Sequence, residues 1–116
     1  MPGEITGEPM IEGKIIKVRF KKSYSEQKVW VFIGKVLKFT ESWLMLDGKG
    51  ILVMKGQVKP VDVDRERRLI VVPRENVSHI RILPDDFDID NISIEIKGVR
   101  IFAKVKNGPD TSVSEI

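Results

Sequence analysis

The chain has 116 residues, of which 41% are hydrophobic and 32% are charged, which indicates one folded domain with a modest core rather than a disordered tail. It contains no cysteine and one histidine, which excludes a disulfide framework, a thiolate metal site, a cysteine nucleophile and a histidine pair within one chain. No run of about 18 apolar residues and no signal-peptide pattern is present, so we expect a cytoplasmic protein without a membrane partner.

The net charge of +3 is distributed unevenly. Between Gly13 and Val58, ten Lys or Arg residues stand against three acids, whereas ten stand against eleven from Lys59 to Ile116. A basic stretch on a balanced domain is typical of a surface that binds a polyanion. It is also typical of lysines that keep sheet edges soluble.

The first elements predicted are an arm and two strands. Residues 1–12 contain two prolines and two glycines, which predicts a flexible arm. Apolar and basic residues alternate over Lys14–Lys22, which predicts a strand with a basic outer face, followed by a polar turn over Ser23–Gln27. Lys28–Phe39 reads as a long strand that is apolar on both faces and bends at Gly34, as in a tightly curved barrel or at a subunit contact.

The middle of the chain predicts three more strands. Trp43–Leu46 continues through a predicted turn at Asp47–Gly50 into Ile51–Met54. Lys55–Arg68 is a polar connection that could hold a hairpin arm. Strands over Arg68–Val72 and Val77–Leu83 are stopped by prolines, and the few residues between them predict a tight, single-turn link.

The last part of the chain predicts an acidic linker and a hairpin. Asp85–Asp90 is acidic, Ile92–Val105 alternates around a turn at Lys97-Gly98, and the residues from Asn107 onward look frayed. No segment has the period of an amphipathic helix. The predicted fold is therefore all-β, with five short strands closing a small SH3-like or Sm-like barrel. The predicted regions are an arm (1–12), a barrel (13–84), a linker with a C-terminal hairpin (85–106) and a frayed tail (107–116).

The sequence does not indicate an enzyme. Ser78 directly precedes His79, and neighbours in a strand point to opposite faces, so the two cannot form a nucleophile–base pair. No glycine-rich loop opens a helix to cradle a nucleotide. We therefore expect no catalytic residues, no cofactor and no small-molecule substrate.

The acidic linker partly matches a calcium loop. Asp86, Asp88 and Asp90 copy the first three ligand positions, but the sixth is Asn91 rather than glycine and the twelfth is Lys97 rather than glutamate. The pattern favours a solvated acidic linker, and we expect no metal site.

Basic and aromatic residues together indicate an RNA-binding surface. Lysine and arginine neutralise phosphates, and aromatic rings stack on bases. Arg74 lies in the tight link after Pro73, where a turn can present it to an anion or leave it solvated. Trp30 and Trp43 fit either base stacking or packing in a core or interface. The candidate RNA-binding residues are Lys17, Arg19, Lys21, Lys22, Trp43, Arg74, Asn76 and His79.

Two motifs suggest a family. Gly34-Lys35-Val36 leads to Phe39-Thr40, and Val72-Pro73-Arg74 is followed after two residues by the alternating run Val77–Ile80. In this order and spacing, residues 13–83 resemble the Sm-like (LSm) family, including its bacterial Hfq-type branch. The chain departs from the family pattern at Thr40 (aspartate), at Trp43 (a base-contacting asparagine) and at Pro73-Arg74 (Arg-Gly). It also lacks the family's N-terminal helix and adds a C-terminal hairpin.

The resemblance implies a non-enzymatic RNA-binding protein that forms a homo-oligomeric ring. Such proteins pair the fourth strand of one subunit with the fifth of the next, a heterologous contact that closes into a cycle. This contact would account for the two-sided apolar runs Leu69–Val72 and Val29–Ile33. The alternative is an SH3-like barrel for protein–protein interaction or assembly without RNA, with the C-terminal hairpin docking by edge pairing.

Overall fold

The computed structural model describes residues 11–21, 29–53, 61–98, 100–106 and 108–115. Within these ranges the chain forms antiparallel strands and short 3-10 turns, which confirms the all-β class. The strands are β1 (Ile15–Phe20), β2 (Val29–Phe39), β3 (Trp43–Val53), β4 (Val61–Val63), β5 (Arg68–Pro73), β6 (Val77–Ile82), β7 (Ile94–Lys97), β8 (Arg100–Ala103) and β9 (Thr111–Glu115). The 3-10 turns are η3 (Arg74–Asn76) and η4 (Ile89–Asn91). The predicted turn at Ser23–Gln27 and most of the predicted N-terminal arm lie outside the described residues.

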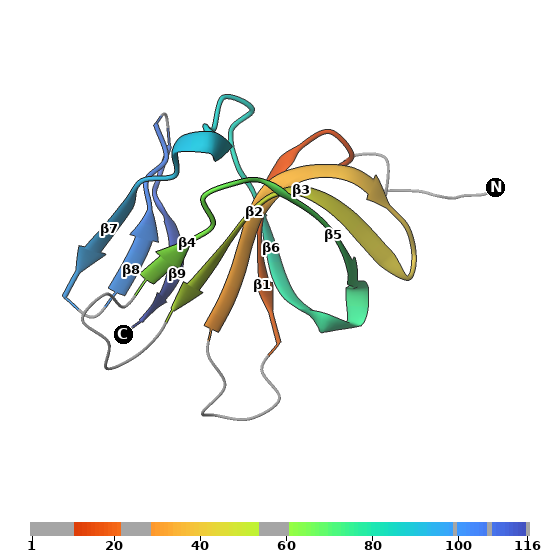
Figure 1. Ribbon diagram of the computed structural model, residues 1–116, viewed down its shortest axis with the longest axis horizontal. Helices are drawn as coiled ribbons and strands as arrows, with labels where there is room; N and C mark the ends of the chain where they lie inside the picture. Colours follow the sequence, from red (N-terminus) through yellow and green to blue (C-terminus); the bar gives the residue numbers. More distant parts are fainter. Residues whose placement is uncertain (1–10, 22–28, 54–60, 99, 107, 116) are drawn as a thin grey trace.

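Strand β2 is the centre of a curved sheet with the order β4-β3-β2-β1-β6, in which β5 also pairs with β3 (Figure 1). The predicted turn at Asp47–Gly50 is wrong, because β3 runs unbroken over 11 residues. Gly48 lies opposite Gly34 in the β2–β3 register. The glycines there let two backbones approach closely within the sheet rather than turning the chain.

The curved sheet is open. Strand β5 pairs with β3 and β6 pairs with β1, but no pairing of β5 with β6 occurs among the described residues. The five predicted strands therefore do not close a barrel within this chain. The turn η3 joins the two edge strands directly, which confirms the predicted single-turn link (Figure 1).

The two faces of the curved sheet contribute to separate hydrophobic cores. The inner face buries Phe32 and Val36 of β2 with residues of β1, β3 and β5. The outer face buries Val31 and Ile33 of β2 with Ile101 and other residues of the C-terminal segment. The two-sided apolar pattern of β2 is therefore explained within one chain for these residues, whereas the sequence left open a tightly curved barrel or a subunit contact.

The C-terminal sheet covers the outer face of the curved sheet. Its order is β7-β8-β9, and the β7–β8 hairpin with its turn at Gly98 confirms the prediction. The segment 107–116, expected to be frayed, instead contributes β9, whose Val113 is fully buried. The outer-face core takes residues from both sides of the predicted boundary at residue 84, including Phe87 and Ile89 of the acidic linker.

Replacing Gly48 tests the close approach of β2 and β3. A Cβ atom there would overlap the backbone of Ile33 and Gly34, which cannot move without breaking the sheet. We expect Gly48→Ala to lower the free energy of unfolding by about 3 kcal/mol or more, measured by urea denaturation. The control is Gly108→Ala, since a Cβ there would meet only Val105 at an ordinary 3.6 Å. Equal stability of the two variants would contradict this account of β3.

Candidate nucleic-acid interface

The structure separates the predicted RNA-binding residues into three places. Lys21 and Asn76 line a pocket on the inner side of the curved sheet. Trp43 and Arg74 meet at the β2–β3 turn, since Trp43 pairs with Pro73, next to Arg74. Lys17, Arg19 and His79 share the outer face of the β1–β6 pair. The eighth predicted residue, Lys22, lies outside the described residues.

The pocket has a volume of about 430 Å³ and combines aromatic, apolar and polar walls. The rings of Phe20 and Trp30 are stacked, with centroids 4.4 Å apart. Trp30 is 43% exposed, which is unusual for so large an apolar side chain. Residues of the β5 edge form the opposite wall, and the amide of Lys21 donates to the carbonyl of Asn76 at 2.8 Å. We call this site the aromatic pocket; it is lined by Phe20, Lys21, Trp30, Ile70, Val71, Val72, Pro73 and Asn76.

Arg74 is engaged with the β2–β3 turn. Its guanidinium donates to the carbonyl of Thr40 at 2.9 Å and lies 4.4 Å from the centre of the Phe39 ring. Its amide donates to the carbonyl of Ser42 at 2.9 Å. Trp43 is half-buried beside this cluster, and its carbonyl accepts from Thr40. The cluster fixes the turn to the β5–β6 link through cation–π and hydrogen bonds.

The third group forms what we call the cationic face, made of Lys17, Arg19, His79 and Arg81 on the outer side of β1 and β6. Lys17 was predicted on a solvated outer face, but its residue is only 4% exposed because the C-terminal sheet covers it. Its ammonium donates to the carbonyl of Ser112 at 2.9 Å and contacts His79 Nε2 at 3.0 Å. Arg81 donates to the carbonyls of Pro109 and Asp110.

Burial and nearby positive charges lower the pKa values of two groups on this face, Lys17 and His79. Burial, with the charges of Arg19 and Arg81, lowers the pKa of Lys17 to about 8. Burial, with Lys17 and Arg19, also lowers the pKa of His79 below its usual value. A neutral His79 ring can accept a hydrogen bond from the Lys17 ammonium, which fits their contact.

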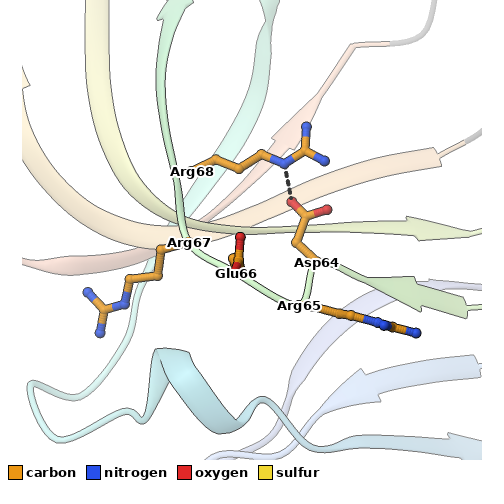
Figure 2. Close-up of a pocket in the computed structure, with 5 residues that line it drawn as sticks. All are labelled: Asp64, Arg65, Glu66, Arg67 and Arg68. Atoms are coloured by element: carbon orange, nitrogen blue, oxygen red, sulfur yellow. Dashed lines mark ion pairs between the residues drawn. The ribbon is translucent and has the colours of Figure 1, made fainter.

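A second hollow lies at the β4–β5 link, lined by Asp64–Arg68 (Figure 2). Two of its arginines form ion pairs with acids: Arg68 with Asp64 at 3.1 Å, and Arg67 with Asp90 at 2.7 Å. The hydrogen bond from Arg67 lowers the pKa of Asp90. Figure 2 shows Arg65 and Arg67 extending to opposite sides of the link, so the arginines do not converge on one ligand. These ion pairs are better explained as structural contacts, of which Arg67–Asp90 holds the link against η4.

The acidic linker has its carboxylates in separate contacts. Asp88 accepts from the amide of Asp90 and from the side chain of Asn91, while Asp85 lies 3.7 Å from the ammonium of Lys14. In the part of the chain that the structure describes, no group of three or more His, Asp or Glu residues is placed to hold a metal ion. The same part contains no helix of the length and hydrophobicity needed to span a membrane.

Comparisons of the chain with protein-family models, with curated proteins and with solved structures gave no match.

The sequence analysis missed the partnership of Phe20 and Trp30. A signal for it exists in the hairpin register, because pairing Arg19 with Val31 brings Phe20 opposite Trp30 at the open end of β1 and β2. Alternation alone assigned both residues to an interior face. It could not show that β5 leaves both side chains partly exposed to solvent.

The lowered pKa of Lys17 predicts a dependence of stability on pH. Between pH 8 and 10.5 the unfolded state binds more protons than the folded state, so stability rises with pH across this window. We expect Lys17→Met to remove a rise on the order of 1 kcal/mol, after allowance for solvent screening. The measurement is the free energy of unfolding of wild type minus variant at several pH values. Lys38→Met, at an exposed position on β2, is the control and should keep the rise.

Proposed function

We propose that this chain is an Sm-like subunit that assembles into a homo-oligomeric ring through β5 and β6 and binds single-stranded RNA at the aromatic pocket. The observation that carries the assembly is the pair of free sheet edges. Each edge strand has one strand neighbour among the described residues, which leaves a row of backbone donors and acceptors available on its other side. Pairing β5 of one copy with β6 of the next would satisfy both rows.

The side chains of β5 support this contact. Leu69 and Val71 are 63% and 56% exposed on the outer side of the strand, whereas Val72 is buried on the inner side. Ile82 of β6 is also largely exposed. A heterologous contact between two different edges forms a ring when its rotation closes. The resemblance of residues 13–83 to Sm-like proteins favours a closed ring over an open filament.

RNA binding rests on the aromatic pocket rather than on the full set of residues expected from the sequence. A stacked Phe20–Trp30 pair offers a face on which a base can stack, and Lys21 supplies a cation for the backbone. Asn76 adds an amide that can donate to a base edge or accept from it. Because the pocket borders β5, ring assembly would place a neighbouring subunit beside it.

The same free edges support a second function. An SH3-like domain without RNA could accept a strand of another protein along β5, by the edge pairing known for extended peptides. The C-terminal hairpin could also dock by edge pairing along β7, the outermost strand of its sheet, whereas its apolar face lies on the curved sheet. The solution mass of the pure chain separates the two functions.

The assembly predicts a sharp response to charge on β5. We expect size-exclusion chromatography with light scattering to give a mass of several subunits for the wild type and of one subunit for Leu69→Lys/Val71→Lys. In the proposed pairing, the new lysines approach the outward Arg81 of the next copy, and like charges directly opposite are unfavourable. Leu37→Lys is the matched control, because Leu37 is 45% exposed on the central strand β2. A monomeric wild type would contradict the ring.

The pocket predicts which aromatic residue binds RNA. We expect Trp30→Ala to weaken binding of a single-stranded RNA about tenfold or more, measured by fluorescence anisotropy. Lys21→Gln should lower the salt slope of the binding constant by about one. Phe102→Ala is the control, because Phe102 lies on the C-terminal sheet rather than at the pocket. The Lys97 ammonium lies 5.5 Å from its ring centre. Loss of binding on changing Trp43 but not Trp30 would contradict the assignment.

A further inference from the structure

We propose that the cationic face is a binding site for a phosphate group, held by Arg19, His79 and Lys17. This site goes beyond the proposed function, because it needs neither the pairing of β5 with β6 nor the aromatic pocket. It lies on the outer side of the curved sheet, at the border of the C-terminal sheet.

The register of β1 and β6 builds the site. Arg19 lies opposite His79, and Lys17 lies opposite Arg81. Side chains two residues apart in a strand share a face, and directly opposite pairs have Cβ atoms about 5 Å apart. The four side chains therefore form a compact block in which phosphate oxygens can reach several donors at once.

Hydrogen-bond donors remain available in this block. The Lys17 ammonium has three N–H groups, of which one meets His79 and one meets Ser112. A His79 ring that accepts at Nε2 carries its proton on Nδ1, which is then a donor. The side chain of Arg19 makes no hydrogen bond or ion pair with any other residue that the structure describes. Arg19 and the Nδ1–H of His79 can donate to separate oxygens of one anion, and the buried Lys17 ammonium adds positive charge behind them.

The charge of the block is unbalanced. The groups that perturb the pKa of Lys17 and His79 are all cations. Asp110 of the covering segment, whose carbonyl accepts from Arg81, directs its carboxylate to the amide of Val105 and to Lys104 instead. Burying cations together without an anion is unfavourable, so a bound anion would offset a cost that the free protein carries.

The geometry favours phosphate over a carboxylate. A phosphate group presents three or four oxygens in a tetrahedron, which suits donors from different side chains, and arginine can bind two of its oxygens together. Access is from the Arg19 and His79 end, because His79 is exposed and Arg19 is half-buried, whereas β9 covers Lys17. The phosphate could be a terminal monoester or part of a nucleic-acid backbone.

The single histidine makes the site directly observable. We would titrate the full chain with inorganic phosphate at constant ionic strength, with chloride as the balancing anion, and follow the His79 ring by NMR. We expect a saturable shift with a millimolar dissociation constant, weakened about tenfold or more in Arg19→Gln. The control Lys38→Gln removes an exposed lysine from β2 and should leave the constant unchanged.

Two further titrations distinguish the sources of the phosphate. A nucleoside 5′-monophosphate carries a terminal dianion, and a dinucleoside monophosphate carries an internal diester. Tighter binding of the former assigns a terminal phosphate, and equal or tighter binding of the latter assigns a backbone phosphate. The proposal is overturned if none of the three compounds gives a saturable shift, or if Arg19→Gln and Lys38→Gln bind alike. Neither result depends on the subunit mass or on Trp30, so this site and the proposed ring can fail separately.

Discussion

The burial of both faces of β2 is the constraint on which the rest of the structure depends. Phe32 and Val36 face the inner core, while Val31 and Ile33 face the outer core, and all four are almost fully buried. Burying a large aliphatic side chain contributes about 1.5–3 kcal/mol. A curved sheet alone would leave the outer residues in water, so the C-terminal sheet is part of the same fold.

The covering sheet determines the polar chemistry around it. Because β9 lies over β1, Lys17 loses its solvent and gains a backbone carbonyl as a partner. Lys49 follows the same rule, as it is buried and donates to the carbonyl of Asp90. A carbonyl group accepts one hydrogen bond from each of these cations but does not neutralise its charge. The cationic face is therefore a consequence of the packing, and its charge remains available to an anion.

Much of the strand order follows from the sequence, because alternation and turn residues are local signals. The strands β1, β2, β5 and β6 and the β7–β8 hairpin lie where the pattern predicted them. The predicted turn at Asp47–Gly50 is wrong because Gly48 there allows close approach to a distant strand residue, Gly34. Strand β9 was not predicted, for a similar reason. Its few apolar residues indicate a strand only when β8 and the outer core are known.

The candidate site was less predictable than the fold, and the cause is again long-range. Alternation gave β1 a basic outer face, but burial of Lys17 depends on a segment that begins more than ninety residues later. Likewise, the sequence left base stacking and packing both open for Trp30. Its exposure depends on the β5 edge, which does not cover it.

Edge pairing uses the backbone groups of a sheet, whereas packing on a face uses its side chains. One small domain can therefore keep its sheet edges available while one face is covered. The C-terminal sheet contributes side chains to the outer core, and its strands pair only with one another among the described residues. It therefore leaves one edge each of β5 and β6 without a strand partner among the described residues, while the aromatic pocket opens on the inner side. Assembly through the edges and RNA in the pocket would both use β5, because Val71 lines the pocket, whereas a phosphate would occupy the outer face. The pocket and the outer face are linked through β1, which carries Lys17 on the outer side and Phe20 at the pocket.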